Sequence, residues 1–156
     1  MKKVLLTFCL VTMYIFTYSD SVAQKSISLD DAQKIATEVF KESRKENVKV
    51  SLVILDKGGN IVLSMKDDNA GLHTLNTAEK KAFTSLTFGI TTTEFAGRVE
   101  KVPNLLQINN TTTLSGGIPL KVGNEVIGSL GIGGAPSGAI DEKIGNAALS
   151  KISNLK

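Results

Sequence analysis

The segment Ser115–Ala147, SGGIPLKVGNEVIGSLGIGGAPSGAIDEKIGNA, decides the fold of this chain. It holds more than half of the 14 glycines, with two apolar runs between them, Ile118–Val122 and Val126–Ile132. Glycine at this density indicates tight turns and close approach of backbones rather than packing by side chains. The segment therefore predicts a hairpin that turns at Gly123-Asn124, then a glycine-rich loop, then a helix from about Gly138.

Upstream of this segment, the hydrophobic pattern predicts two helices and a second hairpin. Ser28 is a suitable N-cap for a helix that ends near Asn47. Two β-rich runs, Val48–Leu55 and Ile61–Met65, flank a turn. A second helix is expected over Thr74–Phe88, with Gly89 as its C-terminal stop.

The segment from Ile90 to Asn110 has a weaker pattern. It predicts one short helix around Thr93–Val99, ended by Pro103, and Thr111–Leu114 is expected to be a short strand. Because hairpins dominate, the chain is expected to be an α+β protein (an α/β sandwich). Its sheet would be mostly antiparallel, with helices packed on it.

The N-terminus has the pattern of a secretion signal. Lys2 and Lys3 precede an apolar run, Val4–Phe16, and small residues follow at Ser21-Val22-Ala23. We expect residues 1–23 to be a signal peptide and residues 24–156 to be one domain that is secreted or periplasmic. A retained anchor is the alternative.

Composition excludes several classes of function. Cys9 is the only cysteine and lies in the expected signal, so no thiol nucleophile or cysteine metal site remains. The formal net charge is only +3, with no basic stripe among aromatics, which argues against nucleic acid as a partner. The sequence has no P-loop, HExxH or Ser/His/Asp order. We therefore expect a protein that is not an enzyme.

Three features are candidates for ligand binding. His73 is the only histidine and precedes a helix, where it could ligate a metal or haem iron or simply lie at the surface. Lys81 could pair with a ligand acid or lie on a solvated face. Gly131–Pro136 lacks the last glycine of a dinucleotide fingerprint. Its loop amides could bind a carboxylate or phosphate, or the glycines could serve only a turn with positive φ. Asp141 and Glu142 are expected only to complement the dipole of the last helix.

Two segments resemble the GlcG/HbpS-like haem-binding family, which is related to the C-terminal domain of PduO-type proteins. The first is Asp67–Thr74 with its continuation Thr77–Ser85, TAEKKAFTS. The second, more specific one combines SGGIPL at Ser115–Leu120, VIGSLGIGGA at Val126–Ala135, and Asp141-Glu142.

The resemblance implies an antiparallel sheet of about five strands in a profilin-like fold, assembled into homo-oligomers. Some members are secreted and bind haem, and one kind passes redox signals to a membrane sensor kinase. Applied to this chain, it implies haem as the cofactor. Haem ligation differs among relatives, so His73 is our own hypothesis for the axial, metal-binding ligand. The expected contacts to the propionates come from Lys81 or from amides near Gly116, Gly117 and Gly134. Phe83 and Ile118 are expected to cover the ring.

The sequence thus predicts a secreted protein that binds haem or a related tetrapyrrole without turning it over, with a role in uptake, sequestration or redox sensing. A membrane sensor or receptor is a possible partner. Two alternatives remain open. One is an oligomeric interaction module without a physiological haem, and the other is an enzyme acting on a small acid or on haem.

Overall fold

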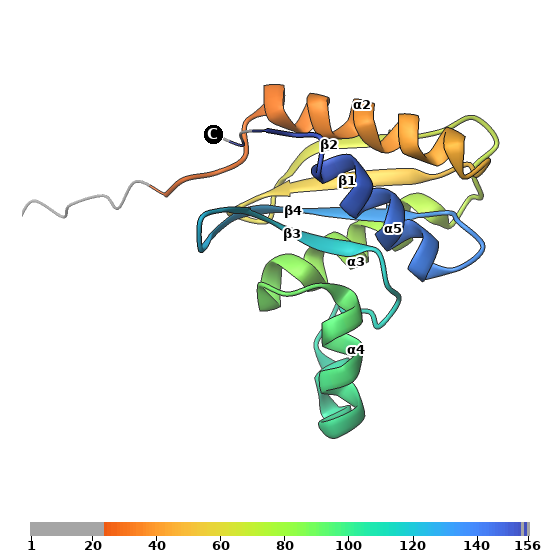
Figure 1. The fold of residues 1–156 in the computed structure, drawn as a ribbon. Coiled ribbons are helices and arrows are strands. Elements are labelled where there is room, and N and C mark those ends of the chain that lie inside the picture. Colours follow the sequence, from red (N-terminus) through yellow and green to blue (C-terminus); the bar gives the residue numbers. More distant parts are fainter. Residues whose placement is uncertain (1–23, 154, 156) are drawn as a thin grey trace, which may run out of the picture.

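The computed structural model describes residues 24–153 and 155, so the expected signal peptide, residues 1–23, lies outside the described residues. Within them, one antiparallel sheet lies between helices on its two faces (Figure 1). The strand order is β2-β1-β4-β3. The strands are β1 (Ser51–Asp56), β2 (Ile61–Lys66), β3 (Gly117–Val122) and β4 (Glu125–Gly133). The α+β class and the antiparallel sheet are confirmed, with four strands instead of about five.

Helices α2 (Leu29–Lys45) and α5 (Gly138–Leu149) cover one face of the sheet, and α3 (Thr74–Phe88) covers the other. The larger core lies under α2 and α5, where Ile35, Leu52, Leu130, Ile132 and Ile144 are almost fully buried. On the α3 side the core is smaller, built on Val53, Leu55, Ala78 and Ala82. The burial of both faces stabilises the three-layer arrangement.

Glycines in β4 and β3 let α3 lie directly on the sheet. A Cβ at Gly131 would lie 1.9 Å from the carbonyl oxygen of Ala78, and one at Gly117 would lie 2.3 Å from that of Lys81. Gly133 is similarly close to Thr74. The glycines of the deciding segment thus serve mainly close helix–sheet contact within strands, and Gly134, at φ 130°, begins the loop to α5.

The ends of the predicted helices agree closely with the structure. The Ser28 hydroxyl accepts a hydrogen bond from the Asp31 amide at 3.1 Å, as an N-cap does. Helix α3 ends at Gly89, which has the left-handed φ of 66° that glycine accommodates without strain. The start of α5 at Gly138 is also as predicted.

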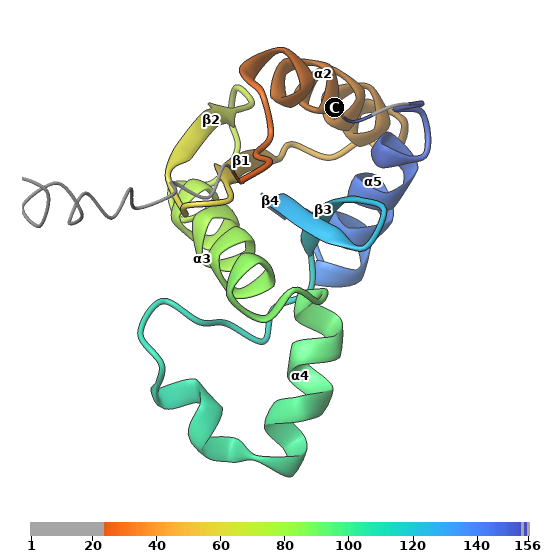
Figure 2. The ribbon, with the colours of Figure 1, turned by 90° about the vertical axis from the view of Figure 1, so that its left-hand side faces the viewer.

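The segment after α3 forms an arm that extends away from the sheet (Figure 2). It consists of α4 (Thr92–Lys101) and the 3-10 helix η1 (Pro103–Gln107). A capping box between Thr91 and Glu94 starts α4. The rings of Phe88 and Phe95, with centroids 4.5 Å apart, fix α4 to the end of α3.

The expected strand at Thr111–Leu114 does not form. The amide of Thr112 donates to the Thr84 hydroxyl at 2.9 Å, which holds this segment along α3 instead. Gly116, at φ 117°, then redirects the chain into β3. The fifth strand is absent because the amides of Thr111, Thr112 and Leu114 donate to Ile108, Thr84 and Thr112 rather than to a neighbouring strand, and the chain enters the sheet only at Gly117.

A buried ion pair joins α3 to the first turn of α5. The ammonium of Lys81 lies 2.7 Å from Oδ2 of Asp141, and each side chain is only 3% exposed. The ammonium also donates to the carbonyl of Ile132 at 2.8 Å, and Oδ1 of Asp141 accepts from the Ala135 amide at 3.0 Å. Burial raises the pKa of the Asp141 carboxyl, and the nearby Lys81 ammonium opposes this rise. The pair is therefore held by geometry and hydrogen bonds against a desolvation cost.

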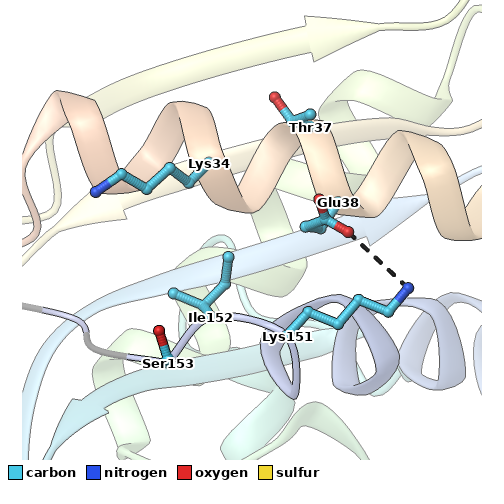
Figure 3. A pocket seen from close by; sticks show the side chains of 6 residues that line it. All are labelled: Lys34, Thr37, Glu38, Lys151, Ile152 and Ser153. Carbon is cyan, nitrogen blue, oxygen red and sulfur yellow. Dashed lines mark ion pairs between the residues drawn. The ribbon is translucent and has the colours of Figure 1, made fainter.

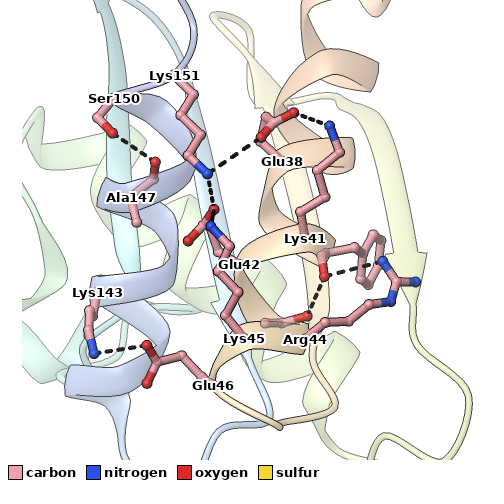
Figure 4. A network of polar contacts seen from close by, with 12 residues as sticks. Glu38, Lys41, Glu42, Arg44, Lys45, Glu46, Lys143, Ala147, Ser150 and Lys151 are labelled. Carbon is pink, nitrogen blue, oxygen red and sulfur yellow. Dashed lines mark hydrogen bonds and ion pairs between the residues drawn. The ribbon is translucent and has the colours of Figure 1, made fainter.

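A second polar network, nearer the surface, connects α2 to α5 and to Lys151 just after it (Figure 4). Lys151 pairs with Glu42 and lies 3.9 Å from Glu38, while Lys143 lies 2.8 Å from Glu46. The lysines are largely exposed, and ion pairs at the surface contribute little stability individually.

We expect Gly131→Ala to destabilise the fold by about 3 kcal/mol or more, because its Cβ would collide with α3 backbone that cannot move independently. The control is Gly97→Ala in α4, where a Cβ meets open space and helix propensity favours alanine by up to about 1 kcal/mol. Chemical denaturation of both variants measures the difference. A Gly131→Ala variant as stable as the wild type would contradict the close-contact account.

We expect Asp141→Ala to cost about 3–5 kcal/mol, because it leaves the Lys81 ammonium buried without its partner, whereas Lys81→Met/Asp141→Leu should cost much less. The single variant Lys81→Met should instead leave the Asp141 carboxylate buried without its ammonium.

Without that ammonium the folded-state pKa of Asp141 rises further, so the carboxyl is protonated more readily in the folded state. The loss of stability of Lys81→Met relative to the wild type should therefore shrink as pH falls from 8 to 5. Urea unfolding across this range tests both; a deficit of Lys81→Met that is independent of pH would contradict the pairing.

Candidate functional site

His73 lies at the N-cap position of α3, and its imidazole is exposed. The ring makes no capping hydrogen bond to the helix and lies close to Gly71, where a Cβ would be 3.1 Å from Cε1. Because His73, Thr77 and Lys81 are spaced four residues apart, they share one face of α3. That face lines a pocket, so α3 presents the imidazole at its mouth.

The pocket has a volume of about 220 Å³ and lies between α3 and the start of α5. The loop Gly134–Gly138 forms one wall, Lys81 and Asp141 form the floor, and Leu114 lies at the rim. Leu114 is 55% exposed, and Leu72, next to His73, is 100% exposed. The pocket therefore combines one accessible imidazole with the exposed side chain of Leu114, while Leu72 is not among the residues that line it.

The structure brings four of the predicted site residues together here. His73, Lys81 and Gly134 line the pocket, and Gly116 lies behind it, where a Cβ would be 3.1 Å from the Lys81 ammonium. Gly117 is also close, but its amide donates to the Thr92 hydroxyl at 2.9 Å. Gly116 and Gly117 are both buried and serve the packing of α3 and the ion pair.

Phe83 and Ile118 lie elsewhere. Phe83 lines a separate hollow with Leu55, Glu79 and Asn110. Ile118 is 5% exposed and packs under α5, where a Cβ on Gly145 would be 2.5 Å from its Cδ1. Neither residue contributes surface to the pocket beside His73.

Two expectations about charged residues need correction. Lys81 is 2% exposed, so it does not belong to a solvated face. Asp141 is equally buried and holds Lys81 and the loop amide of Ala135, a role beyond complementing the dipole of α5. The position of Lys81 between Ala78, Ala82 and Ser85 on a helix of small residues was the available signal for its burial. The sequence did not indicate Thr77 or Leu114 as pocket residues.

Within the described residues, no group of three or more histidine, cysteine, aspartate or glutamate side chains could hold a metal ion. In the same residues, no helix has the length and apolar character to cross a membrane.

A larger surface groove of about 470 Å³ lies between α2 and the end of α5, lined by Lys34, Thr37, Glu38, Lys151, Ile152 and Ser153 (Figure 3). Its two cations are engaged within the chain, Lys34 with Asp31 at 2.7 Å and Lys151 with Glu38 and Glu42. This groove offers no unpaired group comparable to His73.

Comparison of the fold with solved structures gives closely similar proteins. A double-mutant form of HbpS from Streptomyces reticuli is 28% identical, with a TM-score of 0.83 over 88% of this chain and 94% of that one. The protein ORFY from Klebsiella pneumoniae is 26% identical, with a TM-score of 0.82 over 89% and 99%. PduOC, solved as a complex with heme, is 24% identical with a TM-score of 0.75 over 82% and 96%, a likeness of fold.

Sequence comparison agrees with the structural one. An uncharacterized 15.0 kDa protein in the dhaT-dhaS intergenic region of Citrobacter freundii is 30% identical over 114 residues, which cover 70% of this chain and 80% of that protein. Residues 27–150 match the family model described as "Haem degrading protein HbpS-like". This match spans every helix and strand from α2 to α5, and the chain belongs to the HbpS-like family.

Proposed function

We propose that this protein binds haem, or a related tetrapyrrole, at the pocket between α3 and α5, with His73 as the axial ligand of the iron. The observation that carries the proposal is the exposed imidazole of His73 at a pocket that the exposed Leu114 also lines, in a chain of the HbpS-like family. The solved structure of PduOC with heme, which shares the fold, supports the choice of ligand.

The residues present fit the two parts of a haem. His73 offers an imidazole nitrogen to iron. Haem iron, when bound, would supply a centre for binding small ligands and for redox chemistry. Leu72 and Leu114 offer apolar surface to the ring. The propionates are expected at the loop wall near Gly134, where the chain enters α5.

The size of the pocket indicates that one chain does not enclose the ring. Pockets that enclose drug-sized ligands usually measure about 300–1,000 Å³, and this one measures about 220 Å³. A ring bound here would lie across the mouth with one face outside the chain. We therefore propose that a homo-oligomer is the binding form, in which a second copy covers that face.

The biological setting is part of the proposal. If residues 1–23 direct export, the site would meet haem outside the cytoplasm, which suits uptake, sequestration or redox sensing with a membrane sensor or receptor as partner. We propose binding without turnover as the main activity. An oligomeric interaction module without haem is the alternative if no Soret shift occurs.

The family description supports one enzymatic candidate, the degradation of haem. It is tested by adding a reductant to the haem-loaded protein. Loss of the Soret band over many equivalents of haem would favour degradation, and a stable band would favour binding alone.

We expect His73→Ala to weaken haem binding by at least about tenfold and to change the Soret spectrum, because the iron loses its protein ligand. Added imidazole should restore the spectrum. Asn76→Ala, an exposed change on another part of α3, is the matched control and should bind as the wild type does. A His73→Ala variant with unchanged affinity and spectrum would refute the ligand assignment.

We expect the exported protein to begin at Gln24, because the small residues at Ser21-Val22-Ala23 suit a signal peptidase. Intact-mass measurement of protein from the exported fraction tests this. Ala23→Tyr should block cleavage and retain the longer form. Recovery of the full-length wild-type chain in the cytoplasm would contradict the proposed localisation.

A further inference from the structure

We propose that Asp141, held by Lys81, is a positioning residue that fixes the Gly134–Gly138 loop against α3, and that Lys81 acts through this pair rather than by contact with the ligand. The inference rests on the proposed function for its binding readout. Its structural part, the anchoring of the loop, can be measured without any ligand.

The contacts of Asp141 explain why it can act in this way. Oδ1 accepts a hydrogen bond from the Ala135 amide at 3.0 Å, and Ala135 is in the loop that forms one wall of the pocket. Oδ2 accepts a hydrogen bond from the Lys81 ammonium at 2.7 Å. Lys81 lies two turns after His73 on α3. One carboxylate thus fixes the loop opposite the imidazole relative to the helix that carries the imidazole.

The surroundings leave the pair little freedom. A Cβ on Gly116 would lie 2.7 Å from Cβ of Asp141 and 3.1 Å from the Lys81 ammonium. A Cβ on Gly134, next to Ala135, would lie 2.5 Å from the carbonyl oxygen of Lys49, and one on Gly138, at the other end of the loop, would lie 2.7 Å from that of Ser115. Both ends of the loop are therefore closely packed, and the Asp141 contact is made on the side that faces the pocket.

The state of Lys81 argues against direct contact with a ligand acid. The Lys81 side chain is only 3% exposed. Its ammonium already pairs with the Asp141 carboxylate and donates to the carbonyl of Ile132. The third N–H of the ammonium is free in number, but the group is buried, so extending it into the pocket toward a propionate would move it away from Asp141 and weaken the pairing of that buried carboxylate.

The experiment compares two charge-free variants of the purified protein, Lys81→Met/Asp141→Asn and Lys81→Met/Asp141→Ala. Neither leaves an unpaired buried charge, so both are expected to fold, which circular dichroism checks. They differ at one point: the asparagine carbonyl can still accept the Ala135 amide, and alanine cannot. Hydrogen exchange of Ala135 and haem titration are measured on both and on the wild type.

We expect the asparagine variant to protect the Ala135 amide and to bind haem within about threefold of the wild type. The alanine variant should exchange this amide about tenfold faster and bind haem about tenfold more weakly. Equal weakening of binding in both variants would overturn the proposal and assign Lys81 to the ligand. Equal amide protection in both would overturn it without any reference to haem. If the wild type itself binds no haem, the proposed function fails, while the exchange data still decide whether Asp141 positions the loop.

Discussion

The close contact between α3 and the glycine face of β4 is the constraint on which the rest of the structure depends. With 1.9 Å between a would-be Cβ of Gly131 and the Ala78 carbonyl, any other residue there would push the helix off the sheet. Because α3 lies so close to the sheet, Lys81 reaches past the strand ends to Asp141 on α5, which covers the opposite face. The same close packing places His73 beside the loop that follows β4. The strand glycines therefore determine both the packing of α3 and the position of the candidate site.

Much of the fold could be predicted because it depends on local chemistry. The end of α3 requires only a residue with a left-handed backbone conformation, and Gly89 adopts it. The turn between β3 and β4 is formed by Gly123-Asn124, where Gly123 also has a positive φ. The strand expected at Thr111–Leu114 failed because β propensity depends on a partner. The Thr112 amide found the Thr84 hydroxyl instead, a contact between residues that the local pattern does not relate.

The candidate site could be predicted only in part for the same reason. A lone histidine before a helix is visible in the sequence, and the structure does place His73 at a pocket. The roles of Lys81 and Asp141 depend on a contact across 60 residues of sequence, so the partner of Lys81 could not be inferred from spacing. Only the burial of Lys81 had a local signal, in the small residues around it on α3. Phe83 and Ile118 were assigned to the site only because their side chains are apolar. Phe83 lies on a different face of α3 from His73, and Ile118 points from β3 toward α5, so neither reaches the pocket.

The central claim is that the HbpS-like fold of this chain presents His73 as an iron ligand at the pocket between α3 and α5. The most direct measurement is a crystal structure of the purified protein grown with haem. The account predicts iron bonded to an imidazole nitrogen of His73, with the ring across the mouth beside Leu72 and Leu114 and a second copy over its outer face. Haem bound away from His73, or at the groove between α2 and α5, would contradict it.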